Sequence, residues 1–329
     1  MNPNTHTAAI FRSKADAALT AKIYSRVPVL IRDGDAAGNP WGISFMRMFD
    51  MATDSGFFRP EPGPDRVPLI EAKMIHQFDH RWCTYERGDT RDLTSVEKGD
   101  PSFEPIPRYW MDKIMLRDRL AERRWSRRWL IGWRDICRAT DERTLIADLV
   151  PPFACGDKFL LLFPDSNPQM SAVLTGSLNS LVCDYVVRQK LGGTSLKYYI
   201  VKQVAVPPPG SYSEAAIESV SRRVLELAFT SHSMAGFATD LGYDGPPFPW
   251  NEDRRAQLRA ELDAWYGRAY GLTRDELRYI LDPADLMGDD YPSETFRVLK
   301  NKEMKRFGEY RTRRLVLEAW DRMEAGDLT

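Results

Sequence analysis

Three polar side chains alternate along the segment 74–83, and their chemistry is that of residues that contact base edges in DNA. Gln77, Asp79 and Arg81 occupy every second position, a spacing typical of a β-strand, on which they would project from one face. In the major groove Gln pairs with adenine, Arg pairs with guanine, and Asp accepts a hydrogen bond from cytosine. We therefore interpret this segment as a strand that contacts bases. The alternative interpretation is a simple surface ion pair between Asp79 and Arg81.

Two other patterns resemble catalytic or metal sites but lack a necessary part. His76 and His80 have the spacing of metal ligands on a helix, yet their segment alternates like a strand and no third ligand lies nearby. Asp65 with Glu71 and Lys73 imitates the magnesium site of nucleases, which needs two carboxylates on neighbouring strands. Here the two carboxylates lie only six positions apart in the sequence, with Pro68 between them. We therefore predict no catalytic residues and no metal site.

The charge of the chain is segregated along its length although the net charge is only −1. Residues 108–143 hold eleven Lys and Arg against six Asp and Glu, and residues 297–314 hold eight against two. Residues 240–290 have the opposite excess, with twelve acidic and six basic residues. Such segregation can build a basic face on a neutral protein. We predict phosphate contacts from Arg124, Arg128, Arg134, Arg143 and Thr144, and the alternative is solvated helix surface or, for Thr144, a hydroxyl that satisfies a turn.

Periodicity predicts an α+β protein with a mixed-sheet domain followed by a mainly helical region. Helices are expected over 13–26, 111–125 and 171–186, and strands over 129–137, 144–150, 159–163 and 198–204. Beyond the prolines at 207–209 the period is helical, with apolar stripes over 217–227 and 258–269 and a capping box at Thr273 and Glu276. The proline-rich run 58–68 marks a boundary. We therefore expect an N-terminal junction segment with one helix (1–57), an α/β domain (58–212) and a helical C-terminal region (213–329).

Four segments resemble one family of proteins. They are the order L-N-S…D-Y…R-Q-K…G-G-T…Q-V-x-V-P-P-P within 171–209, LIEAKMIHQFDHRW (69–82), WRDICRATDERTLIADLVPP (133–152) and the C-terminal run 270–320. Together they resemble the C-terminal target-recognition (specificity) region of TaqI-like and type IIG adenine-specific DNA methyltransferases, which serve restriction-modification and related phage-defence systems. The resemblance implies a DNA-binding role for double-stranded DNA. It adds Lys73, Lys197 and Lys202 to the expected contacts, since they lie within the matching segments.

The catalytic motifs of such a methyltransferase are missing from the sequence. It has neither a Gly-rich loop for S-adenosylmethionine nor an (Asn/Asp)-Pro-Pro-aromatic loop for adenine, and Asn39-Pro40-Trp41 is the nearest approach. We therefore expect no cofactor in this chain and a separate catalytic methyltransferase domain or subunit as a partner. The start Met1–Thr5 resembles the junction after a catalytic domain. The alternative function is a protein-docking subunit of a phage-defence complex that does not read bases, with the acidic 240–290 segment as its surface.

Composition sets the remaining expectations. No run of the sequence approaches 18 consecutive apolar residues, so no membrane span is expected. Cys83, Cys137, Cys155 and Cys183 are scattered without a Cys-x-x-Cys pair, which is typical of buried thiols in a cytoplasmic protein.

Overall fold

A four-stranded antiparallel sheet lies in the middle of the molecule. The computed structural model describes residues 1–291 and 295–328. The strand order is β1–β9–β6–β7, with β1 at Ser44–Met46, β9 at Phe159–Phe163, β6 at Leu130–Arg134 and β7 at Ala147–Val150. Gly132 in β6 leaves room for the Phe159 ring, which a Cβ at Gly132 would approach to 2.6 Å. Glycine is therefore needed at position 132, because the Phe159 ring packs too closely for any side chain there.

Both faces of this sheet are buried. In β9 all five residues are buried, and they alternate between two cores: Leu160 and Leu162 face one, and Phe159, Leu161 and Phe163 face the other. Burial on two faces explains why this strand is a continuous apolar run in the sequence. The predicted strands over 129–137, 144–150 and 159–163 are confirmed.

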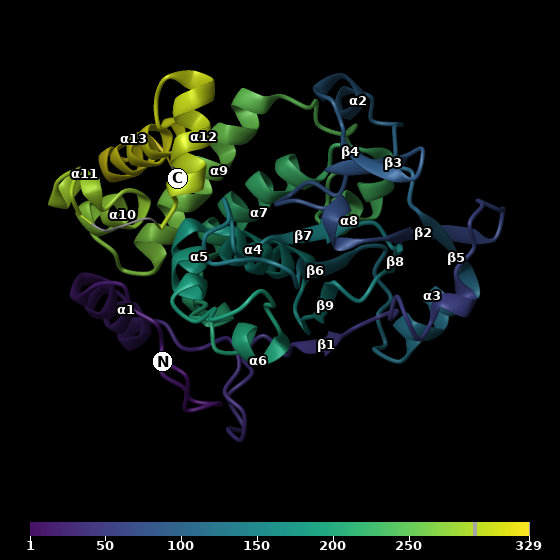
Figure 1. The fold of residues 1–329 in the computed structure, drawn as a ribbon, viewed down its shortest axis with the longest axis horizontal. Coiled ribbons are helices and arrows are strands. Elements are labelled where there is room, and N and C mark those ends of the chain that lie inside the picture. The colour runs from purple at the N-terminus through teal and green to yellow at the C-terminus, as the bar shows by residue number, and fades with distance from the viewer. Residues whose placement is uncertain (292–294, 329) are drawn as a thin grey trace.

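Helices cover one face of the sheet, as Figure 1 shows for α4, α5, α7 and α9. The core on this face contains residues from Leu19 near the N-terminus to Trp320 near the C-terminus. All three expected segments, 1–57, 58–212 and 213–329, contribute residues to it. The longer helices, in chain order, are α1 (Lys14–Arg26), α4 (Pro168–Asn179), α5 (Leu181–Arg188), α7 (Glu214–Ala228), α9 (Glu252–Ala269), α10 (Arg274–Leu281), α12 (Arg297–Phe307) and α13 (Arg311–Ala325).

The other face of the sheet packs on a second, smaller core. It is enclosed by a three-stranded sheet of order β5–β2–β8, with β5 at Tyr109–Asp112, β2 at Arg66–Ile70 and β8 at Ala154–Cys155. A hairpin of β3 (Cys83–Glu86) and β4 (Asp89–Asp92) lies beside it. The remaining α-helices, α2 (Ser95–Gly99), α3 (Lys113–Ala121), α6 (Tyr198–Val201), α8 (Ala235–Asp240) and α11 (Ala284–Met287), connect these elements. The architecture is α+β, as predicted.

Local signals placed several helices correctly. The Ser13 side chain accepts a hydrogen bond from the Asp16 amide at the start of α1, and both halves of the capping box at Thr273 and Glu276 form at the start of α10. The expected helix over 171–186 is instead two helices, α4 and α5, which bend by 54° at Ser180. Ser180 is in an extended conformation and caps α5 with its own side chain. The expected helix over 111–125 is correct only for α3, because residues 109–112 form β5.

The predicted strand over 198–204 is wrong. Residues Tyr198–Val201 form α6, a single helical turn. The Tyr198 ring packs against Phe45 and Trp133, with centroid distances of 5.0 and 5.5 Å, and the Trp133 indole donates to the Leu196 carbonyl at 2.8 Å. A short run of aromatic and β-branched residues fits a strand or a buried turn equally well, and packing against Trp133 decides between them.

Within the described residues, no single helix combines the length and apolarity needed to cross a membrane; α4 and α5 reach them only when the bent pair is taken together. All four cysteines are buried and free, and burial raises the pKa of the Cys83 thiol to about 11.

Candidate functional site

The segment that holds the predicted base contacts is a tight turn and not a strand. The amide and carbonyl of His76 pair with those of Asp79, at 2.9 and 3.1 Å, and Phe78 between them has a φ of +57°. The turn carries the chain from one core to the other, because Met74 and Ile75 lie in the smaller core and Phe78 lies in the larger one. The alternation of residue types along 74–83 therefore arises because this segment packs into two different cores. The strand prediction for 74–83 is wrong.

The contacts of Asp79 and Arg81 leave neither side chain free for DNA. Asp79 is buried and forms an ion pair with Lys98 at 2.5 Å. Arg81 is 0% exposed, and its guanidinium donates to the carbonyls of Lys98, Asp100, Phe103 and Thr230 at 2.8–3.1 Å. The prediction that these two residues contact bases is wrong, because their polar atoms hold the surrounding loops together.

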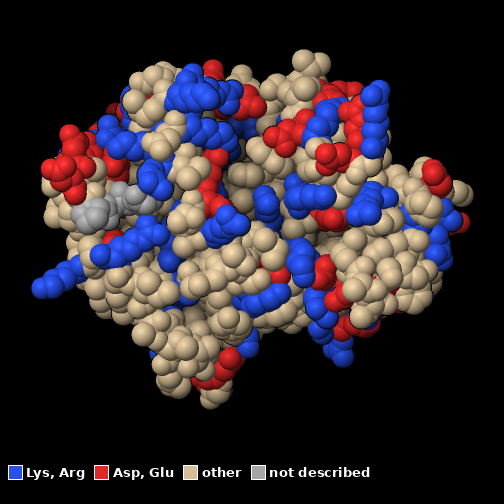
Figure 2. Space-filling view, in the orientation of Figure 1, with Lys and Arg blue, Asp and Glu red and all other residues tan. Residues whose placement is uncertain are grey.

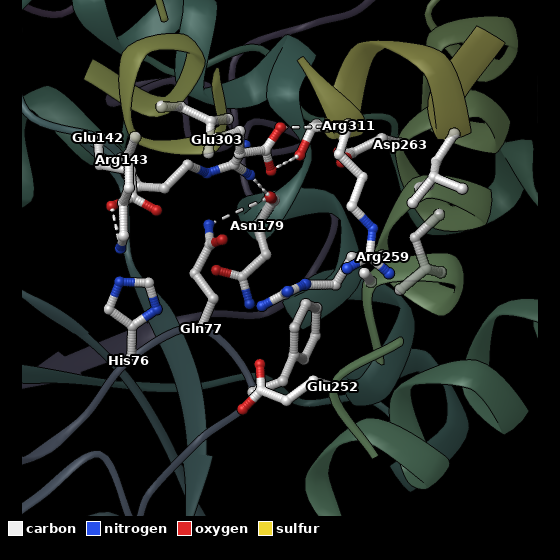
Figure 3. A pocket seen from close by; sticks show the side chains of 18 of the residues that line it. His76, Gln77, Glu142, Arg143, Asn179, Glu252, Arg259, Asp263, Glu303 and Arg311 are labelled. Carbon is white, nitrogen blue, oxygen red and sulfur yellow. Dashed lines mark hydrogen bonds and ion pairs between the residues drawn. The ribbon is translucent and has the colours of Figure 1, made fainter. Parts of the chain in front are cut away.

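Gln77, by contrast, lies in the wall of a cavity of about 190 Å³. Its Nε2 donates to the carbonyls of Leu145 and Asn179, at 3.1 and 3.2 Å, while its Oε1 accepts no hydrogen bond from any described residue. The cavity lies where the turn at 76–82 meets the α4–α5 bend, α9, α12 and the start of α13. Figure 3 labels part of its polar lining. The polar lining residues are His76, Gln77, Glu142, Arg143, Asn179, Ser180, Glu252, Arg259, Asp263, Lys302, Glu303, Arg306, Arg311 and Thr312.

The α9 helix contributes three charged side chains to this wall, Glu252 and, one turn apart, Arg259 and Asp263. Arg259 forms no ion pair or hydrogen bond with any residue that the structure describes, and Figure 3 shows it between Asp263 and Glu252. The buried Asp263 accepts a hydrogen bond from the Leu181 amide at 2.7 Å through its Oδ1. Burial raises the pKa of Asp263 to about 6, although the nearby Arg143 and Arg259 cations oppose this shift.

The interior of the cavity is electropositive around His76. Its ring packs against Trp82 at a tilt of 31°, with centroids 4.4 Å apart. Burial lowers the pKa of His76 well below 6.5, and the charges of Arg259, Arg134, Arg143 and Lys302 lower it further. The imidazole is therefore neutral at pH 7 and can either donate or accept a hydrogen bond.

Other residues predicted to contact DNA either line the cavity or form hydrogen bonds within the protein. The buried Arg143 lines the cavity, donates to the Asn179 carbonyl and forms an ion pair with Asp184 at 3.3 Å. Thr144 is fully buried and its hydroxyl donates to the Arg138 carbonyl at 2.9 Å, so the predicted phosphate contact is wrong and the turn alternative is correct. Arg134 is half-buried at the end of β6, where burial lowers its pKa.

The remaining predicted contacts are dispersed over the surface. Lys197 pairs with Asp135 at 2.6 Å, and Lys202 pairs with Asp33 at 2.8 Å. The exposed Lys73 lies over the Tyr85 ring at 4.6 Å. Arg124, with a φ of +53°, and Arg128 are exposed and precede β6, whereas Arg134 lies at the opposite end of that strand. The structure therefore does not bring all the predicted cations to one site.

The two histidines do not lie together either. His80 is buried and its Nε2 lies 3.0 Å from the Ser231 hydroxyl, whereas His76 packs against Trp82. Glu71 accepts a hydrogen bond from the Tyr85 hydroxyl. Over residues 1–291 and 295–328, no group of three or more His, Cys, Asp or Glu side chains is arranged to hold a metal ion.

Sequence reasoning did not name Asn179, Arg259 or Asp263 as site residues. Asn179 lies in a segment noted for its helical period, and the other two lie in a segment noted for its acidic excess. The i, i+4 spacing of Arg259 and Asp263 places them on one helix face, but a great many surface pairs have this spacing. No protein-family model matches the sequence, and no curated protein matches it.

The raised pKa of Asp263 predicts a stability that depends on pH. Between about pH 4 and pH 6 the native state keeps a proton on Asp263 that the unfolded chain has released, so the free energy of unfolding falls as the pH rises through this window. Asp263→Asn keeps an acceptor for the Leu181 amide and removes the buried charge. We expect the variant to gain roughly 2–3 kcal/mol at pH 8 and almost nothing at pH 4.

Urea unfolding of both proteins at the two pH values measures this difference. Asp244→Asn, at an exposed position in the loop after α8, is the matched control and should be neutral at both. An equal effect of Asp263→Asn at pH 4 and pH 8 would show that Asp263 does not titrate in this window.

Proposed function

We propose that this chain is the sequence-specific DNA-recognition module of an adenine-specific DNA methyltransferase or type IIG restriction-modification enzyme. The catalytic methylase domain, which binds S-adenosylmethionine, is then a separate domain or subunit, and the module works in the cytoplasm. The resemblance of four sequence segments supports this proposal. The observation that carries it is a cluster of exposed cations on α12, beside the mouth of the cavity, which ion pairs within the protein do not fully neutralise.

The basic segment 297–314 and the acidic segment 240–290 pair with each other. Lys300 and Arg313 bind Asp282, and Arg311 binds Asp253 at 2.9 Å. This pairing neutralises Asp253 and Asp282, which belong to the acidic surface that a protein-docking role would use. It favours DNA binding over the docking alternative.

Two cations of α12 have no acidic partner among the described residues, and a third forms only a surface ion pair. Lys305 and Arg306 are exposed and have no acidic partner among the described residues, and Arg306 lines the cavity. Lys302 pairs with Glu142 at 2.7 Å, but both side chains are partly exposed, and such pairs contribute little. In Figure 2 the surface is hollowed between α12 and the β3–β4 hairpin, and Lys and Arg form a band across the middle of this face. DNA phosphates are the ligands that such a band would attract.

The test is the binding of duplex DNA by this chain, measured by fluorescence anisotropy at several salt concentrations. We expect affinity to fall as salt rises, because each phosphate contact releases counterions. The double variant Lys302→Ala/Arg306→Ala should bind more weakly and reduce the slope of log K against log salt by roughly 0.9 for each lost contact.

The matched control is Arg12→Ala/Lys14→Ala. It removes the same charge from exposed positions at and just before the start of α1, which lies away from α12 in Figure 1, and neither residue lines the cavity. If the α12 variant and this control bind DNA equally well, or if the native chain does not bind DNA at low salt, the proposal is wrong.

A further inference from the structure

The cavity has the size and the walls of a site for one flat ring. A cavity of about 150 Å³ accommodates a benzene molecule, so its volume of about 190 Å³ suffices for one heterocyclic ring. Its apolar lining includes Phe78, Leu262 and Leu299, and the aromatic rings of His76 and Trp82 also line it. Such walls favour a ring over a bare inorganic anion.

Several polar atoms that line the cavity have no partner within the described part of the protein and are left to a ligand or to solvent. The Arg259 guanidinium supplies donors, and Gln77 Oε1 and the second oxygen of Asp263 supply acceptors. None of these atoms has a hydrogen-bond partner among the described residues. An apolar guest would displace solvent from these groups without replacing its hydrogen bonds, which is unfavourable. A lone phosphate would satisfy Arg259 but would face the carboxylates of Asp263 and Glu252.

We propose that this cavity binds one nucleobase, which in duplex DNA is a base that has left the stack. A nucleobase combines a flat ring with acceptors for Arg259 and donors for Asp263 and Gln77 along its edge. Lys302 and Arg306, at the same cavity, are placed for the phosphates beside that base. The unstacked base in DNA rests on the proposed function, whereas the affinity of the cavity for a nucleobase does not.

The experiment titrates the intact chain with the four deoxynucleoside 5′-monophosphates and follows heat release and tryptophan fluorescence. Inorganic phosphate and deoxyribose 5-phosphate are the probes without a ring. We expect at least one nucleotide to bind at least about tenfold more tightly than both. Arg259→Met should weaken that nucleotide by about tenfold or more, because a charged hydrogen bond is lost.

Arg268→Met is the matched control. Arg268 is exposed on the same helix, lies over the Trp320 ring and does not line the cavity, so its variant should bind nucleotides as the native chain does. Ala256→Phe is a second variant, which fills the cavity without removing a polar group. It should abolish nucleotide binding while the thermal midpoint shows that the protein is folded.

The outcomes separate this inference from the proposed function. Nucleotide binding that depends on Arg259, in a chain that does not bind duplex DNA, supports the cavity as a nucleobase site and refutes the DNA-recognition role. If the chain binds DNA through α12 but no nucleotide binds better than phosphate at up to about 10 mM, the nucleobase site is refuted and the DNA-binding role stands. If Arg259→Met weakens the binding of nucleotides and of inorganic phosphate equally, the cavity is a simple anion site. That result also overturns the inference.

Discussion

Replacing Arg81 by methionine is expected to destabilise the protein by about 4 kcal/mol. The Arg81 guanidinium is fully buried and donates hydrogen bonds to four carbonyls, three within 98–103 and one at Thr230. Methionine fills a similar volume but offers no donor, so these carbonyls lose their partner in a region from which water is excluded. Arg81 is the side chain that ties the 76–81 turn to both segments.

Urea unfolding followed by circular dichroism measures this loss. Arg87→Met is the control, because Arg87 is exposed at the β3–β4 turn and binds no acidic residue in the described part of the chain. Its free energy of unfolding should change by less than about 0.5 kcal/mol. At temperatures where the Arg81→Met variant is folded, its preference among DNA sequences should be that of the native chain. A change in sequence preference without a change in stability would show that Arg81 reads bases after all.

The second large effect is expected at Asp184. This carboxylate is 0% exposed and accepts hydrogen bonds from the Arg188 Nε at 2.9 Å and from the Thr144 amide at 3.0 Å. It also forms an ion pair with Arg143 at 3.3 Å. Asp184→Ala leaves two enclosed guanidinium groups without a countercharge, which should cost about 3–5 kcal/mol.

The thermal midpoint of unfolding checks this prediction. A loss of this size should lower the midpoint by roughly 10 °C for a chain somewhat larger than 250 residues. Asp118→Ala is the control: its carboxylate is 62% exposed and lies 3.6 Å from Arg117, so its removal should have almost no effect. A midpoint for Asp184→Ala within about 2 °C of the native value would mean that solvent reaches Arg143 and Arg188.

Both expected losses of stability arise at charged side chains that are buried inside the protein. Charged side chains that the sequence presents as candidates for DNA contact are used inside the protein, where they satisfy backbone carbonyls or one another. Arg81, Arg143 and Asp79 are all of this type. The cations left for a ligand are those that the internal pairing does not consume, chiefly Arg259 inside the cavity and the α12 cluster at its mouth.

The sequence by itself determined the α+β class and the elements that local signals define. Side-chain caps at Ser13 and Thr273 satisfy the amides of the first helical turn, and the apolar run 159–163 fits only a strand or helix buried on every side. These signals act within a few residues, so they can be recognised in the sequence without knowledge of the fold.

Only the tertiary structure decided the turn at 76–81, the bend at Ser180, the helical turn at 198–201 and the composition of the cavity. In each case the deciding contacts come from residues far away in the chain: Arg255 donates to the Phe78 carbonyl at 2.8 Å, and the Leu181 amide next to the bend donates to Asp263. Alternation of apolar and polar residues indicates which side chains are buried. It does not indicate whether they belong to a strand of one sheet or to a turn that packs into two separate cores. The partners of a charge are set by the same distant contacts, and for this reason the pairing of 240–290 with 297–314 could not be read from the sequence.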